Sequence, residues 1–145
     1  MSAADLLAHP GDWPRAAAEL AAAGDPSVLP DLVAAYDQPV EASRGELLDA
    51  MEALGGGAEA RRLADSSDAA ERRVAARLMQ LLPEPEHVAA LERLAADDDG
   101  AVAAAARKAL RGQRRTPAWR AAVERLAASD DAGLRAAAES WQAEG

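Results

Sequence analysis

The feature that most limits how this chain can fold is an internal repeat of about 31 residues. Residues 91–99 and 123–131 are identical at seven of nine positions and lie 32 positions apart. Two steps of 31 residues back from Leu94 reach Leu63 and then Leu32, and each of these leucines has an aspartate five positions later. A period of this length predicts stacked copies of one supersecondary unit that cannot bury its apolar face alone.

The composition indicates what the repeated unit contains. The 145 residues include 41 alanines and 17 leucines, but only seven valines and Thr116 are β-branched. Alanine and leucine are strong helix formers, whereas sheets are built mainly from β-branched and aromatic residues. The chain is therefore expected to be all-α, which excludes the all-β and α/β classes.

Each repeat is expected to contain two helices, because its apolar residues recur at intervals of three and four. Leu29, Leu32, Val33 and Tyr36 form one such stripe. The first helices of the repeats are predicted over 2–8, 27–36, 57–65, 84–96 and 117–128. The second helices are predicted over 13–23, 40–54, 69–82, 100–111 and 132–143.

Capping residues mark the ends of the second helices. An aspartate stands at each expected start, where a carboxylate accepts hydrogen bonds from free backbone N–H groups. These aspartates are Asp12, Asp37, Asp68, Asp99 and Asp131. Three glycines follow expected helix ends, and we predict the left-handed C-cap conformation for each of them. They are Gly24, Gly55 and Gly112.

The segment 97–112 carries a resemblance to a known family. Its Asp-Asp-Asp-Gly turn and the alanine-rich helix that ends in Arg-Gly resemble the turn and second helix of the HEAT-like repeat, in its short bacterial form. The resemblance implies an α-solenoid of about five stacked antiparallel helix pairs in a single domain, 1–145. It implies binding of other macromolecules along a concave face lined by second helices. The repeats would span about 1–24, 25–55, 56–83, 84–112 and 113–145.

The charge is unevenly distributed along the chain. The net charge is −9, and residues 1–60 hold 11 acidic and two basic side chains, which also gives −9. Residues 101–125 hold seven basic side chains and one acidic one, a local charge of +6. Such a distribution predicts an acidic region and a basic patch, which can orient a charged partner.

These features together predict a non-catalytic protein that binds another protein along the face of its second helices. Arginine and tryptophan are common in the energetic centres of protein interfaces. The arginines predicted to bind the partner lie on successive second helices: Arg44, Arg73, Arg77, Arg107 and Arg111. Trp141 is predicted as a further contact, because no later repeat follows its helix.

Two other functions are kept as alternatives. A nucleic-acid-binding or repair-type module would use the basic stretch 107–125, although the acidic net charge opposes binding to phosphates. An immunity or antitoxin protein would mask a basic partner with the acidic residues 1–60.

The residues that usually carry chemistry are scarce, so we expect no enzyme activity, no metal and no cofactor. The chain has no cysteine and two histidines, His9 and His87, both expected at exposed helix ends. The run 97–99 is explained by helix capping rather than by a cation site. The glycine run 55–57 lacks the lysine and the preceding strand of a phosphate-binding loop, so a flexible turn is expected there.

The cellular setting is inferred from what the composition lacks. No apolar run reaches the ~18 residues of a membrane span, and the start resembles no signal peptide. The absence of cysteine is compatible with a reducing compartment. We therefore expect a cytoplasmic protein, a monomer or weak homodimer. The ratio of 15 arginines to one lysine suggests a bacterial genome rich in G and C.

Overall fold

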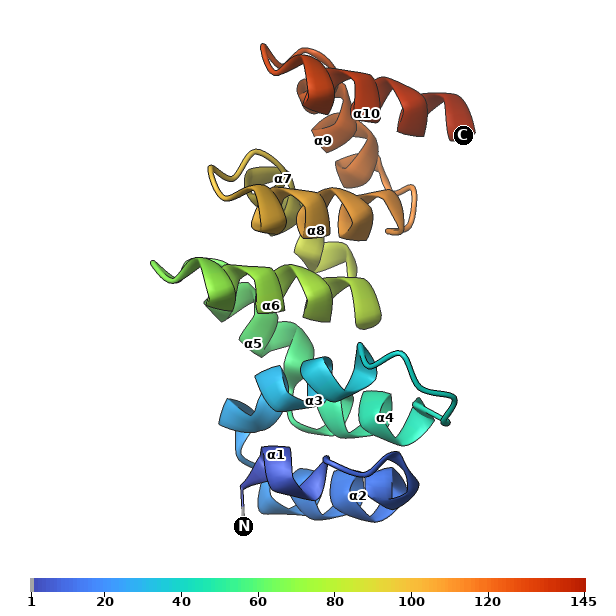
Figure 1. Ribbon diagram of the computed structural model, residues 1–145. Helices are drawn as coiled ribbons and strands as arrows, with labels where there is room; N and C mark the ends of the chain where they lie inside the picture. The colour runs from blue at the N-terminus through green and yellow to red at the C-terminus, as the bar shows by residue number, and fades with distance from the viewer. Residues whose placement is uncertain (1) are drawn as a thin grey trace. The chain divides into compact units, whose positions relative to one another are not determined.

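A computed structural model, which describes residues 2–145, has an all-α fold (Figure 1). These residues form ten α-helices and three short 3-10 helices, with no strand among them. The predicted all-α class is therefore confirmed. None of the helices formed by residues 2–145 is long and apolar enough to span a bilayer.

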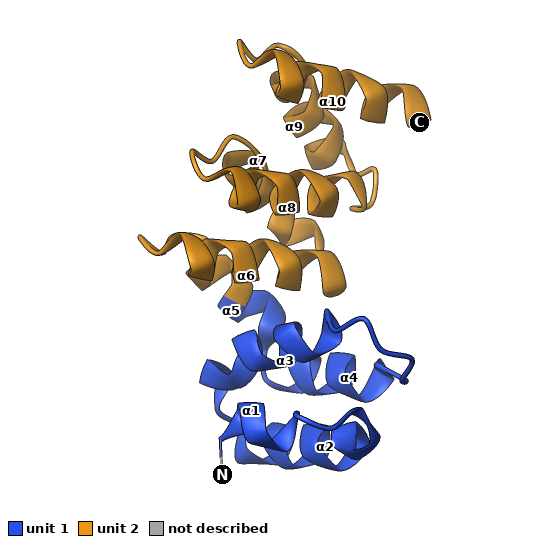
Figure 2. Cartoon of the chain, in the orientation of Figure 1, with its two compact units in different colours: residues 1–59 blue, residues 60–145 orange. Residues whose placement is uncertain are grey.

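The helices group into two compact units, residues 1–59 and residues 60–145, coloured separately in Figure 2. The division falls within helix α5 (Gly56–Leu63). Because each unit has its own core, the two are described one after the other.

The first unit is built around the packing of two helices, α2 (Trp13–Ala23) and α4 (Gly45–Ala53). The short helix α1 (Ala3–Leu6) packs on α2, and α3 (Leu29–Tyr36) packs on α4. Apolar side chains at intervals of three and four residues on these helices pack together and form the core of the unit. The largest fully buried ones are Trp13, Leu29, Leu32, Leu47 and Met51.

The second unit repeats one packing pattern along five helices. Its helices after α5 are α6 (Ala69–Leu81), α7 (Val88–Ala95), α8 (Gly100–Arg111), α9 (Pro117–Ala127) and α10 (Ala132–Glu144). Helix α8 packs on both α6 and α7, and α9 packs on both α7 and α10. The core is again aliphatic and alanine-rich, so the helices approach one another closely. Its largest fully buried side chains are Leu78, Met79, His87, Leu91, Leu110, Trp119 and Leu134.

The aspartate caps are confirmed at three of the five predicted positions. Asp68, Asp99 and Asp131 accept hydrogen bonds from the first backbone N–H groups of α6, α8 and α10, at 2.9–3.0 Å. Asp12 stands at the N-cap of α2 but makes no such bond. The prediction for Asp37 is wrong, because this residue follows the end of α3 and α4 begins only at Gly45.

The glycine caps are confirmed in two cases. Gly24 and Gly55 have φ angles of 70° and 71°, the left-handed conformation that glycine adopts without strain. Gly112 has a φ of −81°, so the prediction of a left-handed cap is wrong there. The expected turn at 55–57 is confined to its first glycine, because α5 already begins at Gly56.

The loop between α3 and α4 explains the largest error in the predicted helix bounds. A helix was expected over 40–54, whereas residues 38–44 are irregular and organised around the Arg44 guanidinium. This group donates four hydrogen bonds of 2.5–3.0 Å to the carbonyls of residues 36, 38, 40 and 42. It also lies over the rings of Trp13 and Tyr36, 5.8 and 5.9 Å from their centroids. Arg44 therefore stabilises the loop from inside.

Candidate partner-binding groove

Helices α6 and α8 pack side by side in the second unit (Figure 1). An open groove lies between them. It has a volume of about 350 Å³, within the range of ligand and peptide pockets. Its lining comes from these two helices alone: Arg73, Arg77 and Gln80 on α6, and Ala101, Ala104, Ala105 and Lys108 on α8. We refer to this feature as the α6/α8 groove.

The helical period places these side chains on one face of each helix. The α6 residues stand at positions i, i+4 and i+7, and those of α8 stand at i, i+3, i+4 and i+7. The residues of α8 that point the other way, including Val102 and Leu110, are fully buried and hold the helix in place. The result is a floor of alanine methyl groups on a rigid support, open to a segment of another molecule.

The groove is positively charged. Arg73 and Lys108 are exposed, and Arg77 is half-buried with its Nη1 donating to Oε1 of Gln80 at 3.0 Å. Of the residues that the structure describes, none that lines this groove is acidic. The two exposed cations, Arg73 and Lys108, stand over an apolar floor and suit a segment that carries both carboxylates and small apolar side chains.

Two of the predicted partner-binding residues, Arg73 and Arg77, thus lie together in the groove. Lys108 lines the groove with them, but the sequence analysis counted it only within the basic stretch 107–125 and not among the residues predicted to bind a protein partner. Lys108 stands seven residues after Ala101, which is two helical turns, and this spacing could have indicated that the two residues share one face of the helix.

Arg107 and Arg111 are placed elsewhere, in contacts within the chain. Arg107 donates from Nε to the Ala95 carbonyl at 3.0 Å, and its Nη2 lies 3.8 Å from the Asp131 carboxylate. Arg111 forms an ion pair with Glu144 of α10, at 3.0 Å. Both side chains therefore connect α8 to other elements of the second unit, and neither lines the groove.

Two further arginines of the basic stretch 107–125 are also engaged within the molecule. Arg115 donates to the carbonyls of Arg111 and Gln113, and its guanidinium lies 4.0 Å from the centroid of the Trp119 ring. Arg125 forms a bidentate pair with Glu92, with both distances at 2.8 Å. The charge of +6 counted along the sequence is therefore partly neutralised in the fold, which weakens its use as a phosphate-binding surface.

Trp141 does not have the exposure expected of a partner contact. Its side chain lies on α10, which packs on α9, and only 5% of the residue is exposed. The packing of the last two helices on each other covers the ring, so no later repeat is needed. The prediction of Trp141 as an exposed contact is therefore corrected by its burial.

His87 is buried rather than exposed, and this corrects a second expectation. It ends the 3-10 turn Pro85–His87 and has no exposed surface. Its Nδ1 lies 3.2 Å from Nη1 of Arg61, which can only donate, so Nδ1 accepts. Nε2 therefore carries the proton and donates to the Leu82 carbonyl at 2.9 Å. Burial lowers the pKa of the imidazole, opposed by that carbonyl and by the Glu84 carboxylate.

The burial of His87 predicts a pH-dependent stability. Because the folded-state pKa lies below the unfolded value of about 6.5, the unfolded chain binds the proton first. The free energy of unfolding is therefore expected to keep its highest value above about pH 6.5 and to decrease as the pH falls towards the folded-state pKa of His87. Urea unfolding followed by circular dichroism between about pH 7.5 and 5 measures this dependence.

The His87→Gln variant isolates the contribution of His87, because it removes the buried imidazole and should flatten the dependence in this pH window. An equal slope in the unmodified chain and in His87→Gln would contradict the assignment of the effect to His87.

The acidic run 97–99 has a structural role in the fold. Asp97 forms a bidentate pair with Arg72 of α6, at 2.9 and 3.1 Å, and Asp99 caps α8. The Arg72 guanidinium lowers the pKa of the Asp97 carboxyl, so the pair stays charged well into the acidic range. Among residues 2–145, no group of three or more histidine and acidic side chains is arranged to hold a metal ion.

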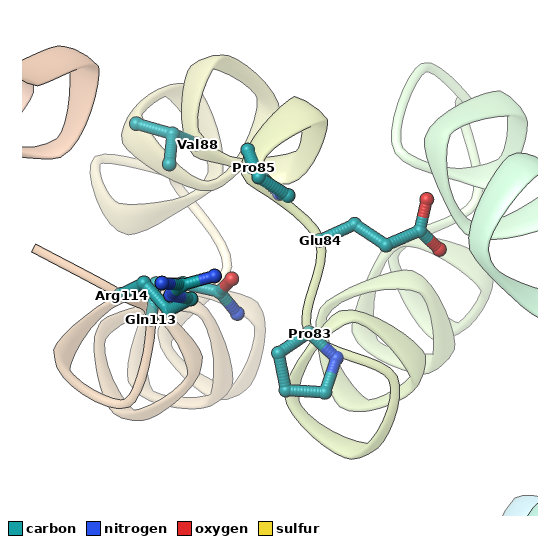
Figure 3. A pocket seen from close by; sticks show the side chains of 6 residues that line it. All are labelled: Pro83, Glu84, Pro85, Val88, Gln113 and Arg114. Carbon is teal, nitrogen blue, oxygen red and sulfur yellow. The ribbon is translucent and has the colours of Figure 1, made fainter. Parts of the chain in front are cut away.

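A small cavity near the start of α7 is too small for a ligand. It is lined by Pro83, Glu84, Pro85, Val88, Gln113 and Arg114 (Figure 3). Its volume of about 20 Å³ is close to that of one water molecule. Figure 3 shows the Glu84 side chain pointing away from Gln113 and Arg114, so no polar groups converge on a bound molecule.

Comparison with known proteins adds no family to these observations. No protein-family model, no curated protein and no solved structure matches the chain. The candidate site therefore depends on the geometry and charge of the α6/α8 groove.

Proposed function

We propose that this protein is a non-catalytic binding module that takes an acidic segment of a partner protein in the α6/α8 groove. The observation that carries the proposal is the placement of Arg73, Arg77 and Lys108 around an alanine floor. A segment with two carboxylates would place one against Arg73 and the other against Lys108, on the two sides of the groove, while its small apolar side chains contact the alanines.

We further infer that the helices pair as HEAT-like α-solenoid hairpins. Support comes from the second unit, where α7 and α8 pair, α9 and α10 pair, and successive hairpins pack on each other through α6 with α8 and α7 with α9. Proteins of this architecture act through extended surfaces rather than through a closed active site. In this arrangement α6 and α8 would be second helices, and the groove between them would lie on the face that the resemblance assigns to partner binding.

An acidic protein segment fits the groove better than a nucleic acid does. No aromatic side chain is among the described residues that line the groove, so bases would have no ring on which to stack. Arg107, Arg111 and Arg125, which would have extended a phosphate-binding surface, are paired with Asp131, Glu144 and Glu92. The net charge of −9 repels any acidic ligand at long range, and it repels a nucleic acid, which carries one charge on every phosphate, more strongly than a short acidic segment.

Fluorescence anisotropy with designed peptides tests the proposal. The acidic probe is an amphipathic helix of about 16 residues, with leucine and alanine on one stripe and glutamate beside it. We expect the unmodified chain to bind this peptide and the Arg73→Glu/Lys108→Glu variant to bind more than about tenfold more weakly, because two attractions become repulsions.

The matched control is Arg114→Glu/Arg120→Glu, which makes the same change in net charge at two exposed positions outside the groove. This variant should keep most of the affinity for the acidic peptide. An equal loss in both variants would contradict a groove-specific site. Binding of duplex DNA, with a steep salt dependence and lost with the groove variant, would favour the nucleic-acid alternative.

A further inference from the structure

The first unit contains a second groove with the opposite charge. It lies between α2 and α4, which pack side by side, and has a volume of about 280 Å³. It is lined by Pro14, Ala17, Ala18 and Ala21 on α2, and by Glu46, Asp49, Ala50 and Ala53 on α4. We refer to this feature as the α2/α4 groove.

The lining follows one helical face on each side of the α2/α4 groove. On both α2 and α4 the four residues stand at positions i, i+3, i+4 and i+7, the same spacing that α8 presents in the α6/α8 groove. Five alanines and one proline leave a shallow apolar floor, so the backbone of an incoming helix can approach closely. Glu46 and Asp49 stand one turn apart at the edge of this floor.

The two carboxylates face no basic side chain within the groove. Residues 1–59 contain only two arginines, and both are committed to other contacts. Arg44 is bound by the four loop carbonyls, and the exposed Arg15 lies 3.9 Å from the Asp12 carboxylate. The Ser43 hydroxyl donates to the Glu46 carboxylate at 3.4 Å. Because a hydroxyl group is neutral, this contact does not compensate the negative charge of Glu46.

We propose that the α2/α4 groove binds a basic amphipathic helix of a partner protein. Two arginine or lysine side chains one turn apart on that helix would pair with Glu46 and Asp49, and its aliphatic side chains would cover the alanine floor. The net charge of −9 over residues 1–59 adds a long-range attraction for such a segment. This site is independent of the one in the α6/α8 groove.

The probe for this site is a basic peptide with the same helical pattern as the acidic probe, with arginine in place of glutamate. We expect the unmodified chain to bind it with a Kd in the micromolar range, measured by fluorescence anisotropy at about 0.1 M salt. Glu46→Gln/Asp49→Asn removes both charges with little change in shape and should weaken binding more than about tenfold.

Two further variants separate the groove from the general acidity of the chain. Glu19→Gln/Glu52→Gln removes the same charge from exposed positions outside the groove and should retain the affinity. Ala18→Leu keeps every charge but fills the floor at an exposed position, and it should weaken binding. Circular dichroism of each variant checks that its helix content is unchanged.

The outcomes distinguish this proposal from the proposed function. The Arg73→Glu/Lys108→Glu variant should bind the basic peptide at least as well as the unmodified chain does, whether or not the acidic peptide binds. Failure of the basic peptide to bind at about 100 μM would overturn the site, because a micromolar Kd would be well saturated there. An equal loss in the Glu19→Gln/Glu52→Gln control would also overturn it, since binding would then follow net charge alone.

Discussion

Replacing Trp119 with alanine is expected to lower the free energy of unfolding by about 4 kcal/mol, the largest effect of any single change considered for this chain. The ring is 1% exposed, and its Nε1 donates to the Leu110 carbonyl at 2.8 Å. Its face is covered by the Arg115 guanidinium, 4.0 Å from the centroid. The alanine variant therefore loses apolar contacts, a buried hydrogen bond and a cation–π contact together.

Urea unfolding followed by circular dichroism measures this loss. One variant separates the contribution of the N–H group, and a second serves as a control. Trp119→Phe keeps most of the apolar volume but removes the N–H group, so it should cost about 1–2 kcal/mol through the lost hydrogen bond and the smaller ring. The Leu110 carbonyl still accepts from the Gln113 N–H in this variant. Arg120→Ala, at the exposed neighbouring position, should change stability by less than about 0.5 kcal/mol. A loss below about 2 kcal/mol for Trp119→Ala would contradict the central packing role of this ring.

The parts of the fold that sequence reasoning predicted well are set by local interactions. The bounds 13–23 and 100–111 agree with those of α2 and α8, because their start and stop signals lie within a few residues of each helix. Asp99, for example, bonds to N–H groups only two and three residues later. Such contacts are encoded in the spacing of a short segment, so the repeat reveals them.

The parts that were predicted poorly depend on partners distant in sequence. Arg111 lies on the predicted helix, but its acceptor, Glu144, is 33 residues away. Arg107 likewise donates to a carbonyl of another helix, at Ala95. Helical spacing predicts the face of the helix on which an arginine stands. It does not predict which carboxylate or carbonyl of another helix accepts the hydrogen bonds of that arginine. His87 was misplaced for the same reason, since its hydrogen-bond partner Arg61 comes from α5.

The candidate site itself was predicted in part. Arg73 and Arg77 were predicted as partner-binding arginines of a second helix, and both line the α6/α8 groove. The alanine floor was visible in the sequence only as high alanine content, which does not distinguish an exposed floor from a buried helix contact. Ala104 is exposed and Ala106 is fully buried, although both belong to one run of four alanines.

Replacing Arg44 with alanine is expected to lower the free energy of unfolding by about 3 kcal/mol. Its guanidinium is the shared donor for four carbonyl groups of the loop between α3 and α4, and no backbone N–H of a regular helix meets them there. Arg44→Lys should recover little of this loss, since an ammonium group on a flexible stem cannot reproduce the planar fork that reaches all four acceptors. Arg15→Ala, at an exposed position of the same unit, should cost less than about 0.5 kcal/mol.

Hydrogen exchange shows which helices lose stability in this variant, whereas urea unfolding gives only the overall loss. In Arg44→Ala, exchange should rise in α4 and its flanking residues 37–53, because the loop that positions this helix has lost its internal support. Amides of α8 should exchange as in the unmodified chain. A uniform rise over all helices would show that the loss of stability is not confined to the first unit, and an unchanged profile with unchanged stability would contradict the role of Arg44 in the loop. Because α4 carries Glu46 and Asp49, the same variant should also weaken binding of the basic peptide while leaving that of the acidic peptide unaffected.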